Sequence, residues 1–453
     1  MVIVQDALEG LKGLLRSVDL SDRARTTVIR CVAAFVLHAG RMSASQAAGA
    51  IRTEPCHRAQ IGRFLKRGWW EKRNLLGRLQ YAVLAMESRS GLFVLMVDST
   101  FCSQQGRLTE NTFSTGNRQR RPRKGRRYNS KKNPPKRVHG FVSGLLVTPS
   151  GIRIPFTKKY LTKETCKKRG VNHRTQTELA ADIIAELELP RGAKLVVLGD
   201  TAFDADSIRE ACRKHKATWI TPVNPERVLA GAKPRPKVRS LLEKLKPQQF
   251  VAMRLHPGQG KLVPYRRLSP HRVGPKAKIR TFYVHGERRA VHSVGEVLLV
   301  VSTIEKPNRG KSLHEPKLLM SNDTSLTPQR MVELYALRWQ IELFFKELKS
   351  TLGLHQYRFK DFRQVEHWMD LVLTTFLYLE WTRARQLARR DLTDQQRRWW
   401  ESQRTHGLCH AVRHSSELRD LFTIRDRLKT PGGIRKLTRA LRDALPVEAR
   451  TAM

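Results

Sequence analysis

Apolar and polar positions follow two different patterns along this chain. From residue 1 to about 90, apolar residues recur at helical spacing, and no strand-like alternation of any length is present. Continuous apolar runs, typical of strands buried on both faces, then appear at 92–98 and 194–200, and each ends in an aspartate. Around them the pattern predicts strands at 138–147, 151–160 and 217–222 and helices at 177–187 and 204–214. Strands that alternate with helices predict a mixed α/β sheet.

The second half of the chain changes character twice. Residues 224–326 are rich in proline and glycine and contain strand-like pieces at 250–255, 279–284 and 297–304, so we expect a β-rich insertion. From Thr327 onward the pattern is helical, and the last part is also rich in arginine. The expected order is a helical region at 1–90, a first part of the core at 91–223, the insertion at 224–326, a second part of the core at 327–380 and a helical region at 381–453.

The charge of the chain points to its partner. Lysine and arginine total 86 against 40 acidic residues, which gives a net charge of +46 at neutral pH. A compact fold with this charge repels itself unless a polyanion screens it, and we expect that polyanion to be DNA. The basic density is highest at 107–137, where Arg126 and Arg127 are among twelve basic residues beside one acidic residue. Because this composition cannot form a core, we expect an arm that follows DNA phosphates, with a plain solvated loop as the alternative.

Other features of the composition bear on the compartment. The six cysteines are far apart in the sequence and form no C-x-x-C pair, which argues against a disulfide scaffold and a zinc ribbon and fits a reducing environment. No apolar run, including 297–301, approaches the ~18 residues of a membrane span. The first residues lack the pattern of a secretory signal. We therefore expect a cytoplasmic protein with no membrane partner.

Two short helices near the N-terminus are expected to contact DNA. The pattern predicts a helix at 43–51 and, after a break at a proline, a second helix at 57–66 that carries Arg58 and Arg63. Two helices with a tight connection resemble a helix-turn-helix, whose second helix enters the major groove. Any small helical bundle gives a similar pattern, and that is the alternative for residues 1–90.

Two aspartates are candidates for a metal site. Asp98 and Asp200 each end a predicted buried strand, and a carboxylate there faces the crevice in which α/β sheets hold their ligands. Two such acids on adjacent strands repel each other unless a cation neutralises them, and hard oxygen ligands suit Mg²⁺ or Mn²⁺. Either aspartate alone is more often a turn or cap residue, so the paired placement is what indicates a metal site.

A polar stripe is predicted on a helix in the second part of the core. At about 100° per residue, Tyr335, Arg338, Glu342 and Lys349 share one stripe roughly 60° wide. Apolar residues occupy the adjoining arc and are expected to face the core, which puts the stripe at the edge of the buried face. An ordinary amphipathic helix with charge pairs four residues apart is the alternative.

The spacing of these four residues, Y-(2)-R-(3)-E-(6)-K, is the signature of a known enzyme family. With the segments around Asp98 and Asp200, it makes residues 90–360 similar to the DDE transposases of the fourth insertion-sequence family. The resemblance implies that Asp98, Asp200 and Glu342 are catalytic and bind two Mg²⁺ ions about 3.5–4 Å apart, with Mn²⁺ as a substitute. It also implies the fold: an α/β, RNase H-like mixed-sheet core with a β-rich insertion, flanked by helical N- and C-terminal domains.

The same resemblance implies a reaction and partners. One ion would activate water and later a DNA 3′-hydroxyl, and the other would stabilise the leaving oxygen. Tyr335, Arg338 and Lys349 would hold phosphates near the cleavage site. A homodimer would cut double-stranded DNA at the terminal inverted repeats of a transposon and join the ends to target DNA in a bacterial nucleoid. Some relatives stack a flipped base on an aromatic, for which Trp219 and Trp339 are both candidates.

Two other functions would use the same residues. A nuclease with this core would cleave DNA without joining it, and the three acids do not separate that enzyme from a transposase. A DNA-binding protein derived from a transposase would lack catalysis, which the intact set of acids opposes. The long basic segment at 107–137 is where the chain departs from the family pattern.

Overall fold

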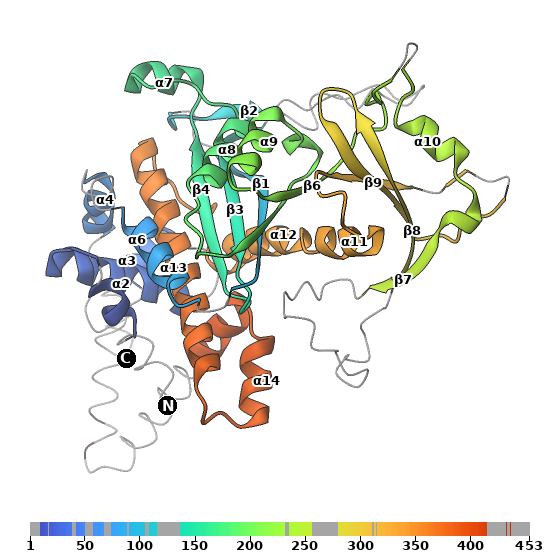
Figure 1. The fold of residues 1–453 in the computed structure, drawn as a ribbon. Helices are drawn as coiled ribbons and strands as arrows, with labels where there is room; N and C mark the ends of the chain where they lie inside the picture. The colour runs from blue at the N-terminus through green and yellow to red at the C-terminus, as the bar shows by residue number, and fades with distance from the viewer. Residues whose placement is uncertain are drawn as a thin grey trace.

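The computed structural model describes residues 10–16, 18–38, 42–49, 58–67, 74–87, 90–104, 108–115, 136–231, 235–255, 280–309, 312–313, 315–414, 432 and 435. In this part of the chain the strands form one ten-stranded mixed sheet, with helices on its faces and a group of helices at one end (Figure 1). The expected α/β class is confirmed.

The first half of the sheet is built around a long central strand. β1 (Leu92–Gln104) pairs antiparallel with β3 (Lys136–Val147), which pairs antiparallel with β4 (Arg153–Tyr160) and the short β2 (Phe113–Thr115). On its other side β1 pairs in parallel with β5 (Lys194–Leu198), which pairs in parallel with β6 (Thr218–Pro222). These strands confirm those expected from the sequence, except for β2, which was not expected. Antiparallel and parallel pairing therefore meet at β1.

The β-rich residues after β6 extend the same sheet. β10 (Lys317–Ser321) pairs antiparallel with β6, and β9 (Gly295–Thr303), β8 (Arg280–Val291) and β7 (Val251–Leu255) follow it, all antiparallel. Three of these strands were expected, and β10 was not. In Figure 1 this half of the sheet reaches away from the group of helices, and α10 (Arg239–Lys244) lies at its outer side.

Different helices cover the two faces of the sheet near β1. The helices between the strands or after them in the sequence are α7 (Lys163–Arg169), α8 (Gln176–Ala185), α9 (Asp206–Lys214), α11 (Pro328–Ala336) and α12 (Trp339–Lys346), and of these α8 and α12 pack on β1. On the face of β1 that carries Leu95, α8 packs closely, since a Cβ added to Gly144 would lie 2.9 Å from Ile183 Cγ2. α12 lies on the opposite face, which carries Asp98, because successive side chains of a strand point to opposite faces.

The group of helices packs around one long helix. It comprises α2 (Asp22–Leu37), α3 (Ala44–Gly49), α4 (Arg58–Lys66), α6 (Leu75–Leu84), α13 (Phe362–Ala388) and α14 (Asp394–Ser402), and residues 10–16 and 405–414 are helical as well. α13 is buried along most of its length and contacts α2, α4, α6 and α14. As expected, the described residues before β1 and after 381 contain helices and no strand. No helix in the described part of the chain is long and apolar enough to cross a membrane.

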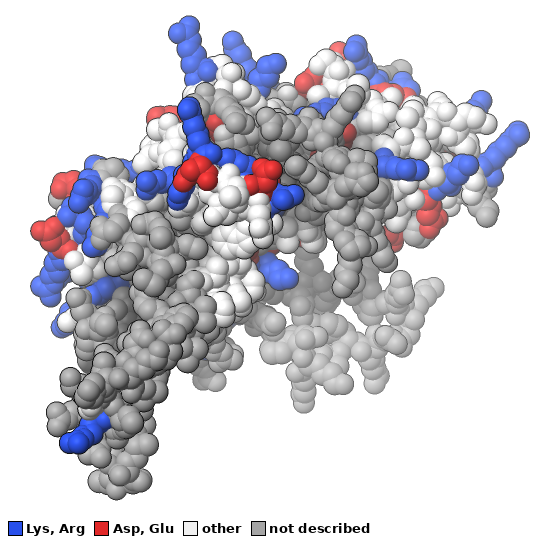
Figure 2. Space-filling model, turned by 90° about the horizontal axis from the view of Figure 1, so that it is seen from below, with Lys and Arg blue, Asp and Glu red and all other residues white. Residues whose placement is uncertain are grey.

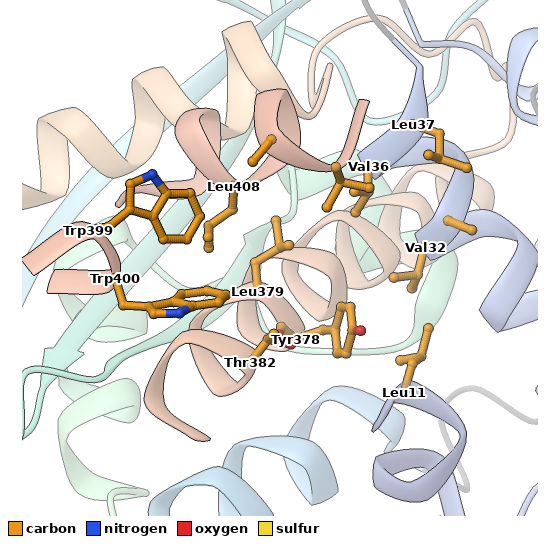
Figure 3. A pocket seen from close by; sticks show the side chains of 13 residues that line it. Leu11, Val32, Val36, Leu37, Tyr378, Leu379, Thr382, Trp399, Trp400 and Leu408 are labelled. Carbon is orange, nitrogen blue, oxygen red and sulfur yellow. The ribbon is translucent and has the colours of Figure 1, made fainter. Parts of the chain in front are cut away.

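The N-terminal and C-terminal helices touch each other. An apolar pocket of about 60 Å³ lies between them, with Leu11 and Val32 on one side and Trp400 and Leu408 on the other (Figure 3). Tyr378 of α13 also lines it. The two ends of the described chain therefore share one core with α13.

Candidate active site

The sheet brings Asp98 and Asp200 side by side. β1 and β5 pair in parallel up to Met96 and Leu198, and each aspartate lies two residues beyond its member of that last pair. Asp200 follows the end of its strand, as expected. The expectation that Asp98 also ends a strand is wrong, because antiparallel pairing with β3 continues β1 to Gln104. The parallel pairing of β1 with β5 ends before Asp98, so the two strands separate at the two aspartates.

Backbone amides orient both aspartates. The Ser99 amide donates a hydrogen bond to Asp98 Oδ1 at 2.7 Å. The Ala202 amide donates to Asp200 Oδ1 at 2.8 Å, where Asp200 caps a short 3-10 turn. Each amide holds Oδ1 of its aspartate, so Oδ2 is the oxygen left to contact side chains from other elements.

Arg338 lies between two acids. Its Nη1 is 3.4 Å from Asp98 Oδ2, and its Nη2 is 2.5 Å from Glu342 Oε1. Burial raises the pKa of Asp98, and the negative charges of Asp200 and Glu342 raise it further, whereas the Ser99 amide and Arg338 lower it. Residues from β1, from the end of β5 and from α12 therefore form one electrostatic cluster.

Two more side chains belong to this cluster. Tyr335 is buried in the last turn of α11, and burial raises its pKa to about 12 against the nearby charge of Arg338. Lys317, the first residue of β10, has its Nζ 4.9 Å from the centre of the Tyr335 ring. Burial lowers the pKa of Lys317, and Arg338 lowers it further, while Glu342 opposes this. Two cations, Arg338 and Lys317, therefore lie beside the acids.

Lys317 was missed by the sequence analysis. Its strand was not expected, because the apolar run that follows it, Leu318–Met320, is only three residues long. The available signal was the position of this run between Pro316 and Asp323, both typical of strand boundaries. Even with the strand assigned, its pairing with β6 is a long-range contact that periodicity does not reveal.

The continuous helix expected from Tyr335 to Lys349 is wrong. α11 ends one residue after Tyr335, and the next amides bond to carbonyls three residues back instead of four. α12 then carries Glu342, and a π-helical turn, Glu347–Thr351, carries Lys349. Because a π turn holds more residues than an α turn, Lys349 is rotated away from the predicted stripe.

Buried ion pairs fix this turn. Glu347 Oε2 accepts hydrogen bonds from Arg153 Nη1 at 3.0 Å and from the Thr405 hydroxyl at 3.1 Å. Arg153 also donates to Glu380 Oε1 at 2.6 Å, and the side chains of Arg153 and Glu380 are 2% and 0% exposed. Contacts from β4, α13 and the helix at 405–414 therefore determine where the turn ends.

Lys349 remains close to the same strand as Asp98. Its charge acts on the thiol of Cys102, whose pKa is raised by burial to about 12 and lowered in part by Lys349. Cys102 lies four residues after Asp98, and residues that differ by an even number share a face of a strand. Lys349 is thus further along the face that carries the acids.

Four arginines were expected to contact DNA. Arg58 and Arg63 are exposed on α4, whereas Arg126 and Arg127 lie outside the described residues, as does the whole of 116–135. On the face shown in Figure 2, lysine and arginine side chains project from many places, including the end that carries α2 and α4.

The two tryptophans considered for base stacking differ in accessibility. Trp219 lies in β6 and is 5% exposed, so its ring is part of the core. Trp339 is 53% exposed at the start of α12, next to Arg338 in the sequence. Only Trp339 of this pair presents a ring to solvent.

The donor set suits a hard divalent cation, but its present arrangement does not hold one. The carboxylates of Asp98, Asp200 and Glu342 are ligands that Mg²⁺ and Mn²⁺ prefer. Within the described ranges, no group of three acidic, histidine or cysteine side chains lies so that it could hold a metal ion. The guanidinium of Arg338 is paired with two of the three carboxylates and so occupies oxygens that a metal ion would need. A metal ion therefore fits the chemistry of these residues only if that pairing opens.

A family comparison agrees with this geometry. A protein-family model described as a transposase DDE domain matches residues 94–378, which is more than half of the 453 residues and includes the whole cluster. The chain therefore belongs to the transposase DDE domain family. Membership implies transposase activity on DNA that depends on divalent metal ions. No curated protein matches the chain.

Proposed function

We propose that this chain is a transposase of the fourth insertion-sequence family, which cleaves DNA at transposon ends and joins the 3′-hydroxyl to target DNA. The observation that carries the proposal is the convergence of Asp98, Asp200 and Glu342 in one electrostatic cluster, with Arg338 between Asp98 and Glu342. The strand order β4-β3-β1-β5-β6, antiparallel up to β1 and parallel after it, supports an RNase H-like core.

In this proposal the three acids hold two Mg²⁺ or Mn²⁺ ions, and basic side chains hold DNA. When bound, the ions supply activation of the attacking hydroxyl and stabilisation of the leaving oxygen. The guanidinium of Arg338 can donate two hydrogen bonds to one phosphate. When Arg338 binds DNA in this way, the carboxylates become available to the metal ions. Tyr335 and Lys317 lie beside Arg338 and contact the same phosphate. Lys349 contacts the DNA backbone further along β1.

The proposed partners follow from the reaction. The substrates are the terminal inverted repeats of a transposon and a double-stranded target, and a homodimer bridges two ends in a synaptic complex. Arg58, Arg63, Arg126 and Arg127 contribute to the DNA-binding surface of a chain whose net charge is +46. The setting is the cytoplasmic nucleoid of a bacterium. A nuclease and a catalytically silent DNA-binding protein are the alternatives.

The test uses labelled duplexes that carry the inverted repeats flanking the gene. We expect cleavage at the repeat tips with Mg²⁺, none with EDTA, and none by the Asp200→Ala protein. Asp391→Asn is the matched control, because Asp391 is 65% exposed and pairs with Arg389 far along the chain from the cluster. A second step follows the labelled 3′ ends into a target plasmid.

Each outcome selects one function. Metal-dependent cutting followed by joining supports the transposase. Cutting without joining moves the assignment to the nuclease, and binding without cleavage in any divalent metal moves it to the DNA-binding protein. Cleavage that survives Asp98→Ala or Glu342→Ala would remove these residues from the active site.

A further inference from the structure

A polar hollow separates two N-terminal helices. It has a volume of about 560 Å³ and opens between α2 and α4. The residues that line it are Arg23, Ala24, Thr26, Thr27 and Arg30 from α2 and Gln60, Arg63, Phe64 and Arg67 from α4 and its end. Four of the nine are arginines, and none is acidic.

The arginines come in two pairs. On α2, Arg23 and Arg30 are seven residues apart, which is two helical turns on one face. Arg63 lies in the last turn of α4, and Arg67 is the residue after its end; both line the hollow. Each helix therefore contributes a pair of arginines to the hollow.

Acidic side chains pair with two basic neighbours of these arginines. Arg25 pairs with Asp22 at 2.7 Å, and Lys66 lies 3.8 Å from Asp361. Among the described residues, Arg23, Arg63 and Arg67 form no ion pair with an acidic side chain. Like charges around one hollow repel each other, and a bound anion would remove that repulsion.

We propose that this hollow binds the sugar-phosphate backbone of duplex DNA, an inference that rests on the proposed function. Arginine forks match the two free oxygens of a phosphodiester, and the hydroxyls of Thr26 and Thr27 are further donors. In this proposal the arginines of α2 and those of α4 hold phosphates of the same DNA strand. Its contacts are with backbone and not with bases, so they hold any sequence.

The connection to α13 gives this binding a consequence for catalysis. Gln364 Nε2 donates to the Gly62 carbonyl at 2.9 Å, and His367 Nδ1 donates to the Leu65 carbonyl at 2.5 Å. α13 packs in turn on the π turn that carries Lys349. DNA held in the hollow is therefore held at a fixed position relative to the candidate active site.

Protection from an arginine-modifying reagent tests the site directly. The full chain is treated with phenylglyoxal, alone and with a short duplex of arbitrary sequence, and modified peptides are measured by mass spectrometry. We expect the duplex to protect Arg23, Arg63 and Arg67. Arg78, exposed on α6 and outside the hollow, is the internal control and should stay reactive. Unchanged reactivity at the three arginines in a sample that is fully bound to the duplex would overturn the proposal.

Salt dependence provides a second measurement. Each phosphate contact contributes about 0.9 to the slope of log affinity against log salt. We expect Arg23→Gln/Arg63→Gln/Arg67→Gln to reduce the slope by roughly two to three, with equal loss on repeat-end and arbitrary duplexes. Arg78→Gln should change it by less than about one. A loss confined to one sequence would indicate base recognition and contradict backbone binding.

The two proposals fail in different ways. If the wild-type protein cleaves transposon ends while the hollow arginines are neither protected nor needed for affinity, only the hollow is wrong. If the wild-type protein neither binds nor cleaves DNA, the proposed function fails and the hollow fails with it.

Discussion

Arg338 competes with a metal ion for the same oxygens. Because it pairs with Asp98 and Glu342, a divalent ion must displace it to reach them. We predict that Arg338→Ala binds Mn²⁺ more tightly than the wild-type protein in the absence of DNA, by about fivefold if the two partly exposed pairs are together worth ~1 kcal/mol. Electron paramagnetic resonance of free Mn²⁺ measures this without catalysis.

The matched control for this experiment is Arg330→Ala. Arg330 is on α11 but pairs with Glu333, so its removal should leave Mn²⁺ affinity unchanged. Equal or weaker Mn²⁺ binding by Arg338→Ala would show that the guanidinium does not compete with the ion. DNA cleavage by Arg338→Ala should fall in either case, since a phosphate contact is lost.

Lys317 is predicted to contribute to DNA binding at the active site. Lys317→Met keeps most of the side-chain length but removes the charge beside Tyr335 and Glu342. We expect weaker binding of cleavable ends, by roughly 1–3 kcal/mol for a lost charge-assisted contact, and partial rescue by Lys317→Arg. Titration of labelled ends under single-turnover conditions measures the loss. Lys237→Met is the control, because it removes a surface lysine that pairs with Glu226. If Lys317→Met loses no more affinity for cleavable ends than Lys237→Met, Lys317 does not have this role.

Residue identity was easier to predict than residue contact. Asp98, Asp200 and Glu342 were predicted as candidates because the two aspartates end apolar runs and Glu342 belongs to a polar stripe with the family's spacing. Lys317 was missed because its neighbours in space come from α11 and α12, which periodicity along β10 does not show. The pairing of Arg338 with Asp98 joins residues 240 positions apart, and sequence spacing carries no trace of it.

At the scale of elements, the Arg153 network contacts the end of the helix that carries Glu342. Glu380 is completely buried and binds Arg153 and Arg383, and Arg153 also binds Glu347 of the π turn. Removing one partner of a buried pair leaves an uncompensated charge, so we predict that Glu380→Gln lowers the free energy of unfolding by about 3–5 kcal/mol. Urea denaturation measures it. Glu186→Gln, which breaks an exposed pair with Lys158, should cost only about 0–1 kcal/mol.

The same pair predicts a pH dependence of stability. Glu380 is buried, but Arg153 and Arg383 lower its pKa to about 2, against about 4.3 in an unfolded chain. A depressed pKa in the folded state stabilises the protein above the unfolded value, and this contribution is lost as pH falls toward 2. The stability difference between wild type and Glu380→Gln should therefore shrink between about pH 5 and pH 3. A difference that stays constant over this range would contradict the charge pairing.

Periodicity predicted the elements that are regular and failed where tertiary contacts changed them. The hairpin of β3 and β4 and the parallel strand β5 were expected, since apolar runs and turn residues are local signals. The single helix from Tyr335 to Lys349 was wrong, because Arg153 and Thr405 hold Glu347 in a π turn. Strands of three or five residues, such as β2 and β10, are too short for a period to be visible.

At the scale of the molecule, one helix connects the N-terminal helices, which we propose bind DNA, to the candidate active site. α13 packs on α2, α4, α6 and α14 and also on β4 and the π turn. The sequence predicted two flanking helical regions, but it carried no signal that Leu11 and Trp400 would line the same pocket. Contacts between the two ends of a chain depend on the whole fold, so local patterns do not predict them.

The net charge of +46 predicts that stability depends on counterions. Repulsion among basic residues opposes the compact state, and salt reduces it over a Debye length of about 8 Å at physiological ionic strength. The melting temperature should therefore rise from low to moderate NaCl concentration. Duplex DNA at the same ionic strength should raise it further, because a ligand at 100 times its dissociation constant stabilises the folded state by about 2.7 kcal/mol.

Differential scanning fluorimetry with and without a duplex measures both effects. The Arg23→Gln/Arg63→Gln/Arg67→Gln protein, with a net charge of +43 (46 less 3), should melt at a higher temperature than wild type in low salt and gain less from DNA. Without DNA, the substitutions remove repulsion around the hollow and raise the melting temperature. With DNA, they remove contacts and reduce the rise in melting temperature that DNA causes. The two effects therefore have opposite signs in the same protein. A variant that gains as much from DNA as wild type would place the backbone contacts elsewhere on this basic surface.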